Sequence, residues 1–349
     1  MKTHTNIFES IISPENLFTA WNEFKRGKNK REDVLAFEFN LEQHIFELHR
    51  DLKSKKYRHG PYSSFYICDP KIRHIHKATV RDRILHHAIF RVLNPIFEPG
   101  FIANSFSCRV GKGTHKGVWA LEKMVRKVSR NYSWYCFALK CDVRKFFDSI
   151  DHDILIKILG RKIADADTMW LLTEVIESFT ASRPNLFDRK GLPIGNLTSQ
   201  LFANVYMNEF DQFMKHAVKA VHYARYTDDF LIVSNSSKYL EGLLPQIHGF
   251  LEKELKLNLH PKKISIRSYR RGIDFLGYVV LPYYRLLRTK TKWRVFRKLE
   301  RRTVQFKESV ISEDSLHQSL QSYLGVLSHA NSYQLQENLQ NQYWFWRTE

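Results

Sequence analysis

The chain has 349 residues, of which 43% are hydrophobic, and 55 Lys and Arg against 36 Asp and Glu give a formal net charge of +19. This composition excludes a disordered chain, and four scattered cysteines without a CxxC pair disfavour a disulfide framework or a Cys-rich zinc site. No segment has the features of a signal peptide or a membrane span, so we expect a cytoplasmic protein without a membrane partner. The positive charge favours nucleic acid as the partner; an acidic membrane surface or an unspecialised basic protein is the alternative.

The N-terminal part of the chain is predicted to be mainly helical. Ser13 followed by Pro14 is typical of a helix start, and an apolar stripe at helical spacing runs over residues 41–52. Residues 62–78 alternate like β-strands, and residues 80–97 return to helical spacing.

The middle of the chain is predicted to mix helices and strands, as in an α+β unit. In chain order we expect a buried strand at 135–143, a helix capped by Ser149 or Asp151, a long helix at 198–219, a hairpin at 221–234, a helix at 237–256 and strands near 263–268 and 273–280.

The C-terminal residues 286–349 are predicted to form a separate helical domain with a basic face. Val295, Leu299, Thr303 and Phe306 supply a narrow apolar seam. The basic residues beside it are Arg288, Lys290, Lys292, Arg294, Arg297, Lys298, Arg301, Arg302 and Lys307. A basic run is often a solvated helix face, but its sign matches the whole-chain excess, so we favour nucleic-acid binding.

Three carboxylates are candidates for metal binding. Asp228 and Asp229 lie at the turn of the expected hairpin, and Asp142 ends an expected strand 86 residues before Asp228. A polar turn is the simple alternative for the Asp pair, but a divalent cation would relieve its charge repulsion. Carboxylates at neighbouring strand ends can hold two Mg²⁺ ions about 3.5–4 Å apart for in-line phosphoryl displacement.

Seven ordered segments resemble the motifs of reverse transcriptases. They are RHIHKATVRDRILHHAI (73–89), NSFSCRVGKGTHKGV (104–118), LKCDVRKFFDSIDHDIL (139–155), GLPIGNLTSQLFANVYMNEFDQF (191–213), ARYTDDFLIV (224–233), LNLHPKKISI (257–266) and GIDFLGYVV (272–280). The resemblance implies an RNA-directed DNA polymerase with an α+β right-hand fold. It implies fingers over 1–135 with part of an insertion near 152–197, a palm with an antiparallel sheet over 136–285, and a helical basic thumb over 286–349.

The resemblance also implies roles for individual residues. Two Mg²⁺ ions, or Mn²⁺ in their place, are expected at Asp142, Val143, Asp228 and Asp229. The other expected contacts are nucleotide-binding Arg73, Arg81, Arg83, Phe147, Ile194, Gly195, Ser199 and Gln200, the primer grip Phe275, Leu276 and Gly277, and the thumb residues Lys292, Arg294, Arg297, Lys298 and Arg301. Lys263, or alternatively Lys262, is expected to protonate pyrophosphate. Phe147 is expected to exclude a 2′-hydroxyl or else to pack in the core, and each arginine has a surface ion pair as its alternative.

One motif narrows the branch of the family. Ile194-Gly195 and Ser199-Gln200 stand where Gln-Gly and Ser-Pro are common, and IGNLTSQ resembles the diversity-generating retroelement reverse transcriptases. That branch is associated with errors at template adenines, mutagenic cDNA synthesis and a basic oligomeric accessory protein. The apolar Ile194 removes a hydrogen-bonding amide near the nascent base pair, which would make selection of the incoming nucleotide less strict. The alternative is that Ile194 marks the lineage and has no effect on fidelity.

The expected partners are template RNA, a DNA primer or cDNA, and deoxynucleoside triphosphates. Because no maturase extension, zinc-binding endonuclease cluster or RNase H domain follows the basic helices, we expect a retroelement enzyme rather than a group II intron protein. A retron or antiphage-defence reverse transcriptase is the alternative. A non-catalytic RNA-binding protein on a polymerase scaffold ranks below both.

Overall fold

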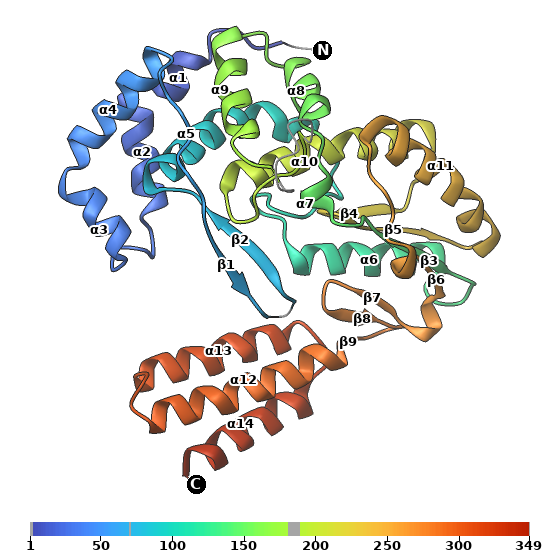
Figure 1. Cartoon of the computed structure of the whole chain (residues 1–349). Coiled ribbons are helices and arrows are strands. Elements are labelled where there is room, and N and C mark those ends of the chain that lie inside the picture. The colour runs from blue at the N-terminus through green and yellow to red at the C-terminus, as the bar shows by residue number, and fades with distance from the viewer. Residues whose placement is uncertain (1–2, 70, 181–188, 349) are drawn as a thin grey trace. The chain divides into compact units, whose positions relative to one another are not determined.

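The computed structural model describes residues 3–69, 71–180 and 189–348 (Figure 1). The chain divides into two compact units, here called the first unit (Met1–Ala103, Asp142–Ala220 and Pro245–Lys262) and the second unit (Asn104–Cys141, Val221–Leu244 and Lys263–Glu349). Each unit is therefore assembled from segments that are far apart in the sequence.

The first unit is mainly helical. Its elements are α1 (Phe8–Ile12), α2 (Pro14–Phe24), α3 (Glu32–Phe39), α4 (Leu41–Lys53), β1 (Ser63–Ile67), β2 (Arg73–Lys77), α5 (Val80–Phe97), α7 (Phe146–Ser149), α8 (His152–Gly160), α9 (Ala166–Glu177) and α10 (Leu197–Gln212). Helix α11 (Ser237–Leu255) has residues in both units. Strands β1 and β2 form an antiparallel hairpin in which Phe65 is opposite Ile75.

Local sequence signals explain several of these helix starts. Ser13 caps α2 by accepting a hydrogen bond from the Asn16 amide, with Pro14 in the first turn. Asp151, rather than Ser149, caps α8 through the Ile154 amide. The predicted stripe over residues 41–52 is confirmed, because Ile45, Leu48 and Leu52 of α4 are buried.

The second unit contains the larger sheet and three C-terminal helices. Its elements are α6 (Thr114–Val128), β3 (Phe137–Asp142, whose last residue belongs to the first unit), β4 (Tyr223–Tyr226), β5 (Asp229–Ser234), β6 (Ser265–Ser268), β7 (Ile273–Phe275), β8 (Tyr278–Val280), β9 (Arg285–Leu287), α12 (Thr289–Lys307), α13 (Glu313–Ser328) and α14 (Tyr333–Thr348). The sheet order is β4-β5-β3-β6, and β7-β8-β9 form a second sheet. Helix α6 packs on β4, β5 and β8.

Two of the predicted elements differ from the structure. The single strand expected at 273–280 is a tight hairpin, because Leu276 and Gly277 both have positive φ and turn the chain between β7 and β8. This conformation suits a two-residue turn, yet Leu-Gly lacks the Asn-Gly signature that would have revealed it. The helix expected to continue to residue 219 ends as α-helix at Gln212 and is followed by a π-helical turn, Phe213–Ala217.

The three C-terminal helices share a core of their own. Val295 and Leu299 of α12 are buried with Leu316, Leu339 and Tyr343. The predicted seam is confirmed by burial of Val295, Leu299 and Thr303, with Phe306 packed against the same core. Among the described residues, no helix is long and apolar enough to cross a membrane.

Candidate functional site

The turn between β4 and β5 presents Asp228 and Asp229. Tyr226 pairs with Asp229 across the hairpin, so Thr227 and Asp228 make a two-residue turn. Thr227 has a φ of 57°, a left-handed conformation that is rare for a β-branched residue. Such backbone strain persists only where surrounding contacts stabilise it.

Arg225 supplies one of these contacts from a fully buried position in β4. Its Nη1 donates to the Thr227 carbonyl at 2.9 Å, and its Nη2 donates to Ser105 Oγ at 3.1 Å. Thr227 Oγ1 adds a 2.6 Å hydrogen bond to Ser107 Oγ. A buried guanidinium is tolerated only with such partners, so Arg225 and the 104–107 segment together fix the turn.

Asp142 ends β3, the neighbour of β5 in the sheet, and β5 begins with Asp229. Lys140 lies two residues before Asp142, and its Nζ is 3.3 Å from Asp229 Oδ2. Because alternate residues of a strand point to the same face, Asp142 shares the face from which Lys140 reaches Asp229. Asp142, Asp228 and Asp229 are all half-buried.

Backbone contacts fix the chain immediately after Asp142. The Asp142 carbonyl accepts the His260 amide at 2.8 Å, and Arg144 N donates to the Asn258 carbonyl at 2.8 Å. Val143 is buried and bridges to Leu259. The pairing segment, residues 258–260, leads directly into the Pro261–Lys263 turn, where Lys262 and Lys263 are both exposed.

The donor atoms of this region suit a hard cation. Carboxylates and a main-chain carbonyl, such as that of Val143, are the oxygen ligands that Mg²⁺ prefers. Within the part of the chain that the structure describes, no three His, Cys, Asp or Glu residues form a ready metal-binding group. The chemistry of the donors therefore fits Mg²⁺, and the expected ion positions remain a prediction.

The first unit holds a cavity of about 270 Å³, here called the basic pocket. Lys28, Arg31, Lys77 and Arg83 line it together with Gly195 and Gln200. An anion would be attracted to this group of cations.

Gly195 lines the pocket at a position where glycine is strongly favoured. It has a φ of 122°, and a Cβ atom there would meet Ile75 Cγ2 at 2.9 Å, so glycine is required for both reasons. His76 N donates to the Ile194 carbonyl at 3.0 Å, and Asn196 Nδ2 donates to the His76 carbonyl at 3.1 Å. These bonds attach β2 to residues 194–196.

Acidic residues already engage two of the expected phosphate-binding arginines. Arg83 Nη2 lies 2.6 Å from Asp33 Oδ2, which also contacts Lys77 Nζ at 2.7 Å. Arg81 pairs with Asp51 at 2.6 Å. Both arginines therefore form ion pairs in this structure, and their nucleotide-binding role stays a prediction, whereas Arg73 is exposed at the start of β2.

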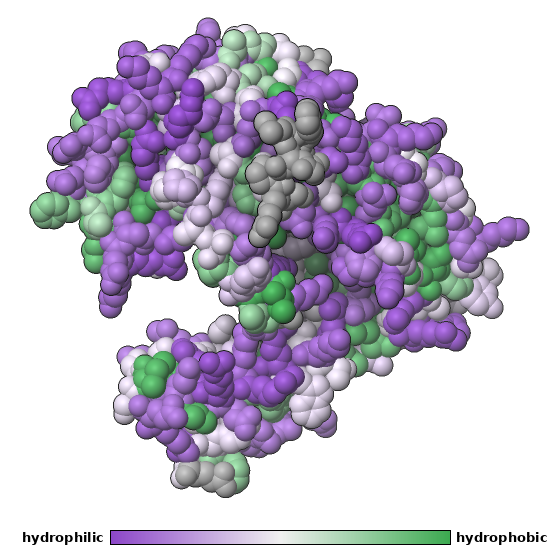
Figure 2. All heavy atoms as spheres, in the orientation of Figure 1, coloured by the Kyte–Doolittle hydropathy of each residue, from purple (hydrophilic) through white to green (hydrophobic). Residues whose placement is uncertain are grey.

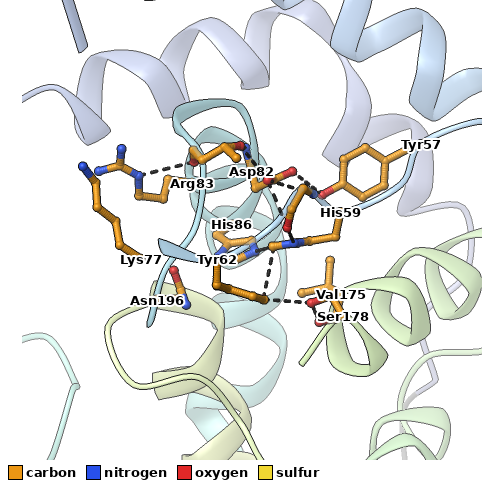
Figure 3. A network of polar contacts seen from close by, with 12 residues as sticks. Tyr57, His59, Tyr62, Lys77, Asp82, Arg83, His86, Val175, Ser178 and Asn196 are labelled. Carbon is orange, nitrogen blue, oxygen red and sulfur yellow. Dashed lines mark hydrogen bonds and ion pairs between the residues drawn. The ribbon is translucent and has the colours of Figure 1, made fainter. Parts of the chain in front are cut away.

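A buried polar network adjoins the pocket through His86, which also lines it (Figure 3). Asp82 accepts hydrogen bonds from Tyr57 Oη at 2.8 Å and Thr79 Oγ1 at 2.6 Å. His59 and His86 are linked through their Nε2 atoms at 3.2 Å. Burial lowers the pKa of His86 well below its ordinary value, so this imidazole stays neutral beside the pocket.

The remaining predicted residues lie as follows. Phe147 is half-buried in α7, whereas its neighbour Phe146 is buried, and Ser199 is buried in α10. In the expected primer grip, Phe275 is buried, and Leu276 and Gly277 form the β7–β8 turn. On α12, Arg297, Lys298 and Arg301 are exposed, and Lys292 and Arg294 are half-buried. In Figure 2 the surface over these C-terminal helices is mostly hydrophilic.

Comparison with known proteins shows the family. The profile described as reverse transcriptase (RNA-dependent DNA polymerase) matches residues 67–280, more than half of the chain. The chain therefore belongs to the reverse transcriptase family, and its helices and antiparallel sheets agree with the right-hand polymerase fold.

Individual relatives agree with this membership. Protein YkfC of Escherichia coli is 27% identical over 70% of this chain and 72% of its own length. The group II intron-encoded protein LtrA of Lactococcus lactis is 22% identical over 78% of this chain, and the match covers 56% of LtrA. Nuclear intron maturase 1 of Arabidopsis thaliana is 26% identical over 48% of this chain and 21% of its own length. By name, LtrA and the maturase are intron proteins, and these relatives give no support for the diversity-generating retroelement branch.

Proposed function

We propose that this reverse transcriptase copies an RNA template into cDNA, with Asp142, Asp228 and Asp229 as the carboxylates of a two-metal site. The observation that carries the proposal is the placement of Asp142 and Asp229 on adjacent strands β3 and β5, with Lys140 linking those strands on the face expected for Asp142. When bound there, two divalent ions would activate the primer 3′-hydroxyl and stabilise the leaving pyrophosphate.

The protein's own residues would position the substrates. Half-buried Phe147 would lie beneath the incoming sugar and exclude a 2′-hydroxyl, and exposed Arg73 would hold triphosphate oxygens through its guanidinium fork. Lys263 or Lys262 would give a proton to pyrophosphate. The β7–β8 turn would support the primer end.

The two basic surfaces would bind the nucleic acid backbone. The basic pocket, which contains Gly195 and Gln200, would take the template close to the nascent pair. The exposed cations of α12 would follow the duplex from the thumb. In this assignment the fingers, palm and thumb keep the boundaries 1–135, 136–285 and 286–349. The insertion near 152–197 includes residues 181–188, which lie outside the described residues.

The finer proposal concerns fidelity. Ile194 offers no side-chain hydrogen bond at the motif that borders the basic pocket, which supports error-prone copying at template adenines in a diversity-generating retroelement. A basic oligomeric accessory protein would then be a further partner. The expected outcome is that cDNA sequencing finds substitutions concentrated opposite template adenine, and that Ile194→Gln reduces them. Evenly distributed rare errors would instead favour a retron or defence role.

Primer extension on an RNA template tests the activity itself. We expect Mg²⁺-dependent incorporation by the wild type and a loss of roughly a thousandfold in Asp228→Ala, because a removed carboxylate weakens the stabilisation of transition-state charge. Asp153→Ala is the matched control, because Asp153 is an exposed α8 carboxylate paired with exposed Arg189. Incorporation that survives Asp228→Ala would refute the assigned site.

A further inference from the structure

Lys140 joins two elements of the second unit that the polymerase reaction would use together. Its Nζ lies 3.3 Å from Asp229 Oδ2 on β5 and donates to the Asp274 carbonyl on β7 at 3.1 Å. The ammonium is also 6.0 Å from the centre of the Phe275 ring. The side chains of Lys140 and Asp229 are only 23% and 22% exposed, so solvent and salt screen this ion pair less than one at the surface.

The ion pair addresses a problem created by the turn. Folding of the hairpin brings the adjacent charges of Asp228 and Asp229 to one corner, and like charges at short range repel. A lysine offers one positive charge and three N–H donors, so Lys140 can neutralise Asp229 while it binds the β7 backbone. The corner is thereby stabilised before any divalent cation arrives.

The contacts continue from β7 to the first C-terminal helix. Arg288 Nε donates to Asp274 Oδ1 at 2.8 Å, and Arg288 N donates to the Gly277 carbonyl at 2.9 Å. Arg288 is also the N-cap residue of α12. A continuous set of polar contacts therefore runs from Asp229 through Lys140 and the β7–β8 turn to α12.

We propose that Lys140 is a positioning residue and the resident counter-ion of Asp229, held in place by the Asp274 carbonyl. This inference rests on the proposed function, because it assumes that Asp229 binds a divalent ion and that the β7–β8 turn supports the primer. In the metal-free protein Lys140 stabilises Asp229. When a cation binds, the retained ammonium opposes it, so Lys140 lowers metal affinity and favours release.

Metal binding and thermal unfolding of the full chain test the inference with Mn²⁺ as the probe. For Lys140→Met we expect Tm in EDTA to fall by about 2–4 °C, and the loss to be smaller by about 1 °C in saturating Mn²⁺. The Mn²⁺ dissociation constant, measured by electron paramagnetic resonance of the free ion, should fall roughly threefold because a competing charge is gone. Lys140→Arg should resemble the wild type.

Two controls separate the counter-ion role from a general loss of positive charge and from a loss of side-chain packing. Lys127→Met removes an exposed lysine of α6 in the same unit and should change neither quantity. In Asp229→Asn, adding Lys140→Met should lower Tm in EDTA by less than it does in the wild type, because the carboxylate charge is already absent and only the bond to the Asp274 carbonyl is lost.

Distinct results would overturn distinct claims. A Tm loss in Lys140→Met that is equal in EDTA and in Mn²⁺, or an unchanged or weaker Mn²⁺ affinity, would overturn the counter-ion role alone. A wild type that binds Mn²⁺ no better than Asp229→Asn would overturn the proposed metal site and the Lys140 role together.

Discussion

The aspartate hairpin, which is β4, the Thr227–Asp228 turn and β5, and the basic pocket of the first unit concentrate charges of opposite sign. In the hairpin, two adjacent carboxylates have Lys140 beside them. In the pocket, Lys77 and Arg83 have Asp33 beside them. Each region thus holds an internal partner for the charges that its proposed ligand would engage, and that ligand must compete with the partner.

The two regions differ in what fixes their backbone. In the hairpin, the buried guanidinium of Arg225 stabilises the strained turn by a hydrogen bond to the Thr227 carbonyl. At the pocket, the absence of a side chain at Gly195 lets this residue lie close to Ile75 of β2. Substitutions of Arg225 and of Gly195 test this difference between the two regions.

Among the substitutions that test this contrast, the largest effect is expected for Arg225→Met. Loss of the hydrogen bonds to Thr227 and Ser105 should destabilise the fold by about 3 kcal/mol. Displacement of the turn should lower primer extension by about a hundredfold or more, because small misplacements of reacting groups are costly. Urea unfolding and kcat/KM measure the two effects. Arg225→Lys keeps the charge but lacks the forked guanidinium, so its stability and kcat/KM should lie between those of the wild type and Arg225→Met. Equal losses in the Lys and Met variants would argue against a contribution of the charge.

Gly195→Ala should come next. The added Cβ meets Ile75, and the alanine must adopt a φ of 122°. We therefore expect a loss of about 1–3 kcal/mol in the free energy of unfolding. Gly113→Ala is the matched control, because Gly113 has a similar φ of 109° with no atom within 4 Å of an added Cβ. It should show the backbone strain alone, about 1 kcal/mol. Equal losses in both variants would remove the steric role of Ile75.

Asp33→Asn should act in the opposite direction, on binding. Releasing Lys77 and Arg83 should strengthen RNA binding about two- to fivefold at low salt. The slope of the logarithm of the binding constant against the logarithm of the salt concentration should become steeper by about one. Asp51→Asn frees Arg81, which does not line the pocket, and serves as the control. If both variants changed RNA affinity alike, a general charge effect would explain the result better than the pocket.

The smallest expected effect is a pH dependence of stability. Burial, followed by the nearby charge of Lys28, lowers the pKa of His87 from 6.5 to about 4. The unfolded chain therefore binds a proton more readily than the folded chain as pH falls from about 6.5 to 4, and stability decreases over that interval. Partial exposure limits the effect to on the order of 1 kcal/mol. In His87→Gln this part of the slope of unfolding free energy against pH should vanish; an unaltered slope would assign it to other groups.

Local and periodic signals explain what the sequence could predict. Patterns among neighbouring residues predicted three features: the helix at 80–97, the Ser13 cap and the hairpin around Asp228. The structure shows all three. The expected strand containing Asp142 also forms, adjacent to the strand that begins with Asp229.

Partners that are remote in sequence could not be predicted. Asp33 is 50 residues from Arg83, and Lys140 is 89 residues before Asp229 (229 minus 140), so no spacing rule joins either pair. Arg225 offered one usable signal, a charged residue among apolar neighbours in a strand. The Leu276 turn gave none, because leucine rarely adopts positive φ.

Diffraction from a crystal of the full chain with primer, RNA template and Mn²⁺ tests the central claim most directly. We expect two anomalous peaks about 3.5–4 Å apart, bound by the carboxylates of Asp142, Asp228 and Asp229. Peaks bound elsewhere, or an Asp142 carboxylate remote from both ions in a complex poised to extend its primer, would contradict the proposed two-metal site.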